Sequence, residues 1–378
     1  MFRRVISRPV ASVAGVQTAF CSTAAVQKLP LQGSETIAVE NGKTMNMLQA
    51  INSAMDHALA KEPKSVLFGE DVAFGGVFRC SLDLRDKYGA HRVFNSPLCE
   101  QGVAGFAIGM AAVGWKPIAE IQFADYIFPA FDQIVNEAAK YRYRSGSQFD
   151  CGGLTIRTPC SAVGHGGLYH SQSVEGYFAH TPGLKVVMPS TPAEAKGLLL
   201  QCVAEEDPCL FLEPKILYRT SVEEVNPDYF TLPIGKGRVV VEGSDLTIVT
   251  YGNQVNTAMK TVKALKEKGV HAELIDLRSI VPWDRELVYQ SVKKTGRVIV
   301  THEAQKTCGF GAEVISSITH DCFLHLEAPP SRVCGLDTPF PLHERLYLPN
   351  EHKLTEAALN LVNHSAAASL VHFLRTST

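Results

Sequence analysis

The chain places a single carboxylate, Glu100, at the start of a segment that is rich in small residues. The run that follows, Gly102–Gly109, has a composition typical of a closely packed helix. Glu100 is the only acidic residue between Asp86 and Glu120, so it is not part of a solvated charged run. A lone carboxylate at the mouth of an apolar helix acts either as a cap for backbone N–H groups or as a site acid with a raised pKa. These residues alone favour the cap.

Histidines form the second group of candidate residues. A glycine-bounded loop, Gly164–Ser173, contains His165 and His170, and His180 follows it. Their spacing fits no single helix face and no Cys/Asp cluster accompanies them, which argues against a zinc site. A histidine in such a loop suits proton transfer on a bound substrate, because its pKa lies near the working pH. We assign that role to His170 and interpret His165 and His180 as ordinary surface histidines.

An aromatic segment, Gln122–Pro129, joins an expected strand to an expected helix. In parallel α/β sheets, ligands collect at the carboxyl ends of strands, so this turn is a candidate binding region. Most of its aromatic side chains, and Phe131 after it, are nevertheless expected in the core.

Hydrophobic periodicity predicts alternating helices and strands along the whole chain. In the first half, a helix with Thr44 as its N-cap ends before Pro63, and later helices begin at Glu100, at Pro129 (to about Tyr143) and at Pro192. The strands expected between them are residues 65–68, 118–123, 154–157, 184–188 and 209–212. In the second half we expect strands 246–250, 272–275, 298–300 and 332–334, with helices 255–266 and after Gly311. This alternation predicts an α/β fold with two doubly wound domains, each a parallel sheet covered on both faces.

Composition bounds the class of protein. The 378 residues are 46% hydrophobic with a formal net charge of −2, and no basic stripe or apolar run of membrane-spanning length is present. We therefore expect no nucleic-acid partner and no membrane insertion. The ten cysteines include no Cys-x-x-Cys pair, which favours a reduced compartment. Residues 1–34 lack acids and contain scattered arginines among Ser, Thr and Ala, which predicts an approximate mitochondrial transit peptide and a matrix location.

From about Val39 onward, the chain resembles the beta subunits of branched-chain 2-oxo acid dehydrogenases, in the decarboxylating component. The matching segments are Phe68–Val72, Gly75–Arg79, Pro97–Gly102, Gln122–Gly146, Gly166–Ser173, Glu213–Lys215, Asp276–Arg278 and Val281–Asp284. The resemblance implies a pyrimidine-type thiamine-diphosphate-binding domain at 39–225, a linker at 226–238 and a transketolase C-terminal-like domain at 239–370. Pyruvate dehydrogenase beta subunits are similar, and they are the alternative family.

The resemblance also implies site roles. It places Glu100 against N1′ of the thiamine aminopyrimidine, where proton exchange activates the cofactor toward the 2-oxo acid carbonyl. Glu100 should then have a raised pKa in an apolar setting of Leu98, Val103 and Phe106. Tyr126 stacks on the pyrimidine ring, Leu98 adds to the cofactor-binding surface, and His170 assists proton transfer during acyl transfer to a lipoyl group. The implied activity is that of a 3-methyl-2-oxobutanoate dehydrogenase (2-methylpropanoyl-transferring), acting in Val/Leu/Ile catabolism.

One motif is missing. Thiamine enzymes hold the diphosphate through Mg²⁺ with a Gly-Asp-Gly motif and a downstream Asn, and this sequence contains no Gly-Asp-Gly. The resemblance therefore implies an alpha subunit that holds Mg²⁺ and shares the cofactor, in a heterotetramer of two alpha and two beta chains. A lipoyl-bearing dihydrolipoyl acyltransferase core is the further implied partner.

The family also carries a structural K⁺. The resemblance assigns it to Gly152, Leu154, Thr155, Cys202, Glu205 and Asp207, of which the last three lie at a helix end whose carbonyls suit a cation. Glu205 and Asp207 stand where the family often has Asp and Asn, so a site made by main-chain carbonyls would survive and one made by side chains would be altered.

Two other hypotheses do not require a catalytic site that is shared with an alpha subunit. A self-sufficient transketolase-like homodimer conflicts with the missing Mg²⁺ motif. A non-catalytic scaffold with the same fold conflicts with the joint presence of Glu100, Tyr126 and His170.

Overall fold

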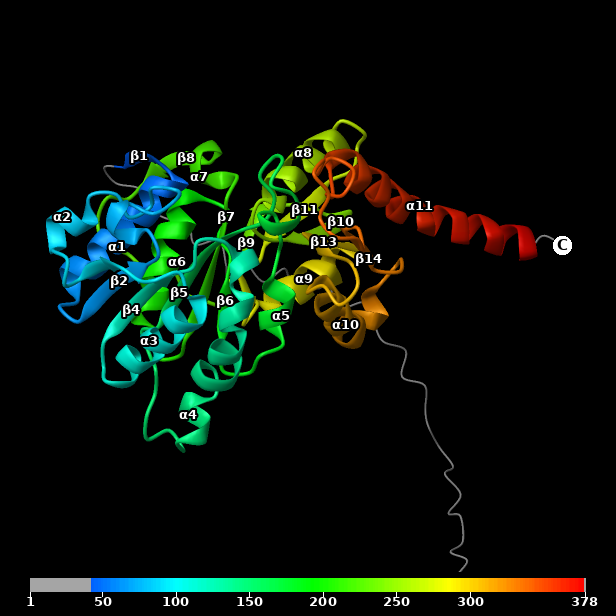
Figure 1. The fold of residues 1–378 in the computed structure, drawn as a ribbon. Helices are drawn as coiled ribbons and strands as arrows, with labels where there is room; N and C mark the ends of the chain where they lie inside the picture. The colour runs from blue at the N-terminus through cyan, green and yellow to red at the C-terminus, as the bar shows by residue number, and fades with distance from the viewer. Residues whose placement is uncertain (1–41, 377–378) are drawn as a thin grey trace, which may run out of the picture. The chain divides into compact units, whose positions relative to one another are not determined.

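The computed structural model describes residues 42–376, with side chains described as far as residue 364. The expected transit peptide, residues 1–34, lies outside the described residues. Helices and strands alternate along the described chain, as the hydrophobic pattern predicts, and the strands form two large sheets of mainly parallel strands (Figure 1). None of the described helices is both long and apolar enough to span a bilayer.

The first sheet has seven strands in the order β12-β6-β7-β5-β4-β2-β3, all parallel except the edge strand β12. Its strands are β2 (Ser65–Gly69), β3 (Val93–Asn95), β4 (Lys116–Glu120), β5 (Thr155–Cys160), β6 (Lys185–Val187), β7 (Cys209–Pro214) and β12 (Ser279–Val281). The last of these comes from the second half of the chain, so the two halves share this sheet.

Both faces of the first sheet are covered, because successive strand residues point to opposite faces. Val66 and Phe68 pack in the cluster that includes α3 (Glu100–Ala112), whereas Leu67 packs in the cluster that includes α1 (Met47–Lys61) and α6 (Pro192–Ala204). The small residues after Glu100 serve this packing, since Ala104 and Ala107 are fully buried.

The second sheet has five strands in the order β14-β13-β10-β11-β9, with β9 antiparallel at the edge. The bounds are β9 (Arg238–Val241), β10 (Leu246–Thr250), β11 (Ala272–Asp276), β13 (Val298–Gln305) and β14 (Ser331–Gly335). Its helices are α8 (Gln254–Lys266), α9 (Arg285–Thr295), α10 (Gly311–Cys322) and α11 (Glu351–Thr376), of which α9 and α11 were not expected from the sequence. The expected strands and the helix at 255–266 are confirmed.

The first helix begins at a local capping motif, and the predicted N-cap of this helix was wrong. The first helix begins after Asn46, whose side chain accepts from the Gln49 N–H while the Gln49 side chain accepts from the Asn46 N–H. Thr44 instead lies in strand β1 (Lys43–Asn46), because that segment pairs with β8 (Val222–Val225). Strand β8 ends at Val225, directly before the linker expected at residues 226–238.

The segment from Pro129 to Tyr143 is mostly helical, as expected, but it does not form one continuous α-helix. The segment is a 3₁₀ turn (Phe128–Ala130), a π-helical turn (Gln133–Ala138) and the short helix α4 (Tyr141–Arg144). The turn at Gly183 packs closely against this irregular segment, because a Cβ on Gly183 would collide with the Ala139 carbonyl. The expected strand at 118–123 similarly ends at Glu120, because Gln122 and Phe123 leave the sheet. Three further short helices complete the fold, α2 (Leu84–Tyr88), α5 (Glu175–Ala179) and α7 (Leu217–Thr220).

Candidate active site

Three neighbouring parallel strands lead into segments of the candidate site, and a fourth strand, β3, precedes Glu100. β2 leads into Glu70, β4 leads into the aromatic turn with Tyr126, and β5 leads into the loop with His170. Because β5, β4 and β2 are adjacent in the sheet, these three segments lie next to one another at the carboxyl end of the sheet. These segments thus lie at the carboxyl ends of parallel strands, where ligands collect in α/β folds.

Tyr126 and His170 are joined directly. The Tyr126 hydroxyl and the His170 Nε2 are hydrogen-bonded at 3.0 Å, and the Phe123 ring meets the His170 ring edge to face, with centroids 4.7 Å apart. Both Tyr126 and His170 are partly exposed. A tyrosine and a histidine that hold each other in place, with one face open, can present a ring surface and a proton-transferring nitrogen to the same ligand.

Glu100 is the first residue of α3, and the N-cap is Cys99, whose side chain makes no capping bond. The Glu100 carboxylate lies beside that of Glu70, a residue that is 7% exposed. Burial and the charge of Glu100 together raise the pKa of Glu70 to about 7. The Glu70 Oε1 atom is buried and has no hydrogen-bond partner among the described residues. The structure thus pairs Glu100 with a second acid, to which the sequence reasoning gave no role.

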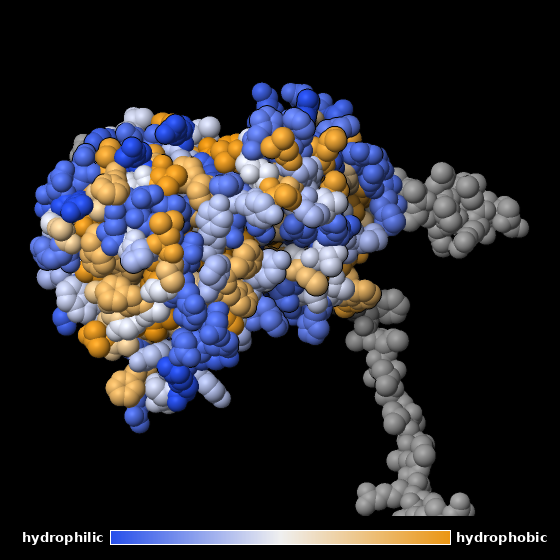
Figure 2. Space-filling model, in the orientation of Figure 1, coloured by the Kyte–Doolittle hydropathy of each residue, from blue (hydrophilic) through white to orange (hydrophobic). Residues whose placement is uncertain are grey.

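The expected apolar setting of Glu100 is only partly present in this chain. Val103 is buried, but Leu98 is 85% exposed and Phe106 is 52% exposed. Figure 2 shows hydrophobic side chains at the surface in the region of α3. Exposed apolar patches of this kind mark surfaces that another molecule covers. The chain by itself therefore does not enclose Glu100, and Leu98 lies where a cofactor or a partner could contact it.

A buried charge cluster lies beneath the strand ends and was not identified from the sequence. Arg157 on β5 is 1% exposed and pairs with Glu120 on β4 and Glu213 on β7, the latter at 2.8 Å. The Tyr218 hydroxyl also donates to Glu213. Glu120 ends β4 and Glu213 lies in β7, the strands on either side of β5. The ion pairs therefore link three neighbouring strands beneath the site. Only the tertiary pairing reveals this cluster, since Glu120, Arg157 and Glu213 are far apart in the sequence.

The six residues assigned to K⁺ meet where two loops touch. The Gly153 N–H donates to the Glu205 carbonyl at 2.8 Å, and the Cys209 N–H donates to the Leu154 carbonyl at 2.9 Å. A Cβ on Gly152 would lie 2.9 Å from the Glu206 carbonyl oxygen, so the loops are in close contact. The structure therefore brings Gly152, Leu154 and Thr155 together with the end of α6, which carries Cys202 and Glu205.

The candidate ligands of a cation in this region are backbone carbonyls and one hydroxyl, because the acidic side chains have partners. The Glu205 side chain is paired with Lys185, and Asp207 is paired with Arg142 at 2.9 Å, so both side chains are already engaged. The Thr155 Oγ1 atom is buried and has no hydrogen-bond partner among the described residues. In residues 42–364 no group of three or more His, Cys, Asp or Glu side chains is placed to hold a metal ion. Carbonyl and hydroxyl ligation is what these residues offer.

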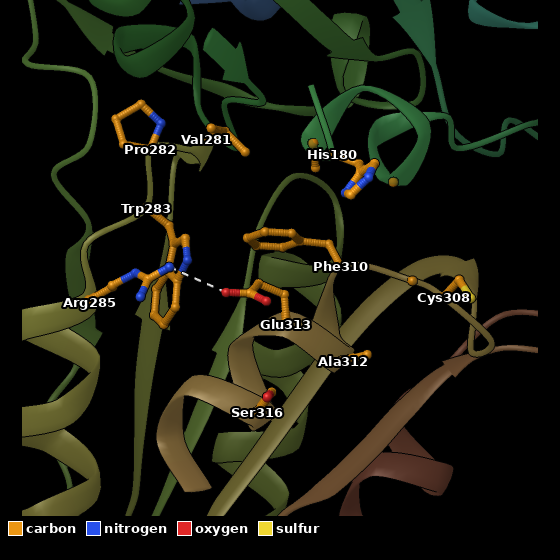
Figure 3. A pocket seen from close by; sticks show the side chains of 13 residues that line it. His180, Val281, Pro282, Trp283, Arg285, Cys308, Phe310, Ala312, Glu313 and Ser316 are labelled. Carbon is orange, nitrogen blue, oxygen red and sulfur yellow. Dashed lines mark hydrogen bonds and ion pairs between the residues drawn. The ribbon is translucent and has the colours of Figure 1, made fainter. Parts of the chain in front are cut away.

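His165 and His180 lie apart from His170. His165 is exposed, and its Nδ1 is hydrogen-bonded to the Leu342 carbonyl at 3.0 Å. His180 borders a separate cleft of about 620 Å³, whose walls include Trp283 and Phe310 (Figure 3). Arg285 in this cleft is paired with Glu313 at 3.2 Å, which neutralises its charge. None of Glu100, Tyr126 and His170 lines this cleft, so it is distinct from the candidate active site.

Comparison with known proteins matches both halves of the chain. Residues 43–221 match the family described as "Transketolase, pyrimidine binding domain", and residues 235–354 match "Transketolase, C-terminal domain". Among solved structures, a chain titled "Split gene transketolase, inactive beta4 tetramer" is similar with a TM-score of 0.67 and 24% identity, over 84% of this chain and 98% of that one. This likeness establishes the transketolase-type fold.

Similar curated proteins narrow the family. The 2-oxoisovalerate dehydrogenase subunit beta, mitochondrial, of Dictyostelium discoideum is 63% identical over 85% of this chain and 88% of its own length. The corresponding subunit beta 2, mitochondrial, of Arabidopsis thaliana is 57% identical over 86% and 91%. The pyruvate dehydrogenase E1 component subunit beta of Acholeplasma laidlawii is 45% identical over 82% and 95%. The alternative family is thus the more distant of the two.

Proposed function

We propose that this chain, which belongs to the family of 2-oxoisovalerate dehydrogenase beta subunits, contributes one half of a thiamine-diphosphate site that decarboxylates branched 2-oxo acids. The observation that supports this proposal is that, in a chain of this family, Glu100, Tyr126 and His170 all follow the carboxyl ends of strands of one sheet, with Glu100 beside Glu70 and Tyr126 bonded to His170. Lipoyl acylation in Val/Leu/Ile catabolism, as in a 3-methyl-2-oxobutanoate dehydrogenase (2-methylpropanoyl-transferring), belongs to the same proposal, as does a mitochondrial matrix location after removal of the transit peptide.

The chain's own residues have distinct proposed roles. Glu100, beside Glu70, holds or gives up a proton at N1′ of the aminopyrimidine, and Tyr126 supports the ring. His170 moves a proton at the reacting group, in an orientation kept by the Tyr126 hydroxyl. Leu98 covers the cofactor once a partner has enclosed it. When bound, thiamine diphosphate supplies the carbon nucleophile and the electron sink.

A partner must complete the site. The sequence has no Gly-Asp-Gly motif for Mg²⁺, and Leu98 and Phe106 are exposed beside Glu100. Both observations support an alpha subunit that holds Mg²⁺ and covers this face, in an assembly of two alpha and two beta chains. Within that assembly we also propose the acyltransferase core as partner and domain boundaries near residues 225 and 239.

The proposal is tested by measuring decarboxylation by the purified chain alone and after co-expression with an alpha subunit. Thiamine diphosphate and Mg²⁺ are added, and 2-oxoisovalerate is compared with pyruvate. We expect turnover only in the co-expressed sample, with the branched acid strongly preferred. Preference for pyruvate would assign the chain to the alternative family. Turnover by the lone chain would indicate a self-sufficient enzyme, and an assembled but inactive complex would indicate a scaffold.

Replacement of His170 by alanine should separate the two half-reactions. Acylation of a lipoylated carrier domain should fall roughly 10²-fold, the lower end for loss of a general acid or base. Decarboxylation measured with an artificial electron acceptor should change little, because Glu100 is untouched and the Tyr126 ring keeps its contact with the Phe123 ring. His165→Ala, an exposed histidine of the same loop, is the matched control. Equal loss in both half-reactions would contradict the role of His170.

The proposed K⁺ site predicts an ion-specific stabilisation. Replacing Na⁺ by K⁺ should raise the Tm of the assembled protein, because an ion that binds only the native state stabilises that state. The free energy of unfolding should rise by about 2–3 kcal/mol when K⁺ is in hundredfold excess over its Kd. Thr155→Val should remove most of this difference. Thr158→Val is the matched control, since Thr158 lies on the same strand and its Oγ1 is also buried without a hydrogen-bond partner among the described residues. An unchanged K⁺ effect in Thr155→Val would contradict the site.

A further inference from the structure

The loop that carries His170 is closed at its base by hydrogen bonds from both of its ends. The Ser161 N–H donates to the Gln172 carbonyl at 3.0 Å. The Gln172 N–H donates to the Asp125 Oδ1 at 3.1 Å, and the Ala162 N–H donates to the Glu303 Oε2 at 3.1 Å. Each end of the loop is thus held by a carboxylate as well as by the other end.

The two anchoring carboxylates come from different halves of the chain. Asp125 precedes Tyr126 in the aromatic turn and is 8% exposed. Glu303 lies on β13 of the second sheet, is 7% exposed, and also accepts from the Asn253 Nδ2 at 3.1 Å. The second sheet therefore reaches the base of the His170 loop. Buried carboxylates are costly unless hydrogen-bond donors or a positive charge accompany them.

Lys215 supplies that charge. It is 3% exposed, and its backbone N–H donates to the carbonyl of Cys160, the residue before the loop, at 3.1 Å. Its ammonium group lies 5.8 Å from the centroid of the Phe123 ring, the same ring that packs against His170. The Nζ atom is buried and has neither a hydrogen bond nor an ion pair with the two carboxylates among the described residues, so its effect on them is that of a nearby charge without direct contact.

The pKa values of Lys215 and Glu303 are shifted by burial and, in the opposite direction, by the groups around them. Burial lowers the pKa of Lys215, and the nearby Asp125 and Glu303 oppose that shift. Burial raises the pKa of Glu303, and the Ala162 N–H, Asn253 and Lys215 oppose it. A carboxylate that stays ionised accepts backbone N–H bonds more strongly than a neutral acid does. Loss of the ammonium group would therefore weaken both anchors of the loop.

We propose that Lys215 and Glu303 are positioning residues for His170, with Lys215 as the buried cation that holds the two anchoring carboxylates at the base of its loop. This inference rests on the proposed function for its kinetic consequence. It assigns to the second sheet a part in the acyl-transfer half of the reaction, because Glu303 holds one end of the loop. Neither residue touches the reacting atoms.

The test uses the chain assembled with its alpha subunit and compares Lys215→Met with Lys196→Met. Lys196 is also fully buried, but its ammonium group donates to the Asn226 and Pro227 carbonyls, away from the loop, both at 2.8 Å. Two readouts are taken. One is the ratio of lipoyl acylation to decarboxylation, and the other is amide hydrogen exchange in residues 161–173.

Lys215→Met should lower lipoyl acylation about tenfold, less than full loss of a general acid or base, because His170 itself is kept. Decarboxylation should stay within about twofold, and exchange in residues 161–173 should rise. Lys196→Met should change neither the ratio nor the exchange of this loop. Equal loss in both half-reactions, or unchanged exchange in the loop, would overturn the inference.

Glu303→Gln tests the same arrangement from the other side if Lys215→Met does not assemble. The introduced amide can still accept from one N–H group but carries no charge, so the same selective loss is expected at smaller size. Unchanged acylation in this variant would overturn the inference. If the unmodified complex decarboxylates no 2-oxo acid, the proposed function fails, and the hydrogen exchange of residues 161–173 still decides whether Lys215 holds the loop.

Discussion

Glu100→Gln is expected to abolish turnover while leaving the assembly intact. Glutamine has nearly the same size as glutamate but cannot exchange a proton with the aminopyrimidine, and in the proposed function that exchange begins every turnover. We expect the decarboxylation rate to fall roughly 10⁴-fold, the upper end for loss of a general acid or base. The rate is measured in the co-expressed complex with 2-oxoisovalerate, and assembly is measured by size-exclusion chromatography.

A matched control separates this role from that of a helix-terminal charge. Glu351 is likewise the first residue of a helix, α11, and is exposed. Glu351→Gln removes the same kind of interaction with a helix N-terminus and should leave turnover unchanged. If Glu100→Gln retained turnover, Glu100 would act only at the helix start, which is the interpretation that its local sequence favours.

Arg157→Met is expected to produce the largest loss of stability. It removes the one buried cation between Glu120 and Glu213 and leaves both carboxylates without their ion pair. Breaking a buried ion pair by removing one partner costs about 3–5 kcal/mol, because the remaining charge stays buried. The free energy of unfolding is measured by urea denaturation of the assembled protein.

Arg285→Met serves as the comparison, since Arg285 pairs with Glu313 at 3.2 Å but both side chains are more than half exposed. Exposed pairs contribute little because water already solvates each charge. We expect little or no change in the urea midpoint of this variant. A similar loss in the two variants would show that the Arg157 cluster contributes no more than a surface pair.

Local sequence predicts the regular elements wherever packing follows their periodicity. The strands at β2, β5, β7 and β10 and the helix α8 were predicted because their apolar residues repeat at strand or helix spacing. The segment from Pro129 to Tyr143 has a helical pattern, yet it forms 3₁₀ and π turns where the turn at Gly183 approaches Ala139. That contact lies between residues distant in sequence, so periodicity carries no information about it.

The sequence by itself determined the family, the two-sheet α/β architecture and the identity of Glu100, Tyr126 and His170 as candidates. These rest on residue types and short motifs, which are local. The tertiary structure alone decided which charges meet, including Glu70 beside Glu100, Arg157 between Glu120 and Glu213, and Lys215 near Asp125 and Glu303. Electrostatic interactions depend on distance and burial in space. Neither quantity is set until parallel strands far apart in the chain are placed side by side.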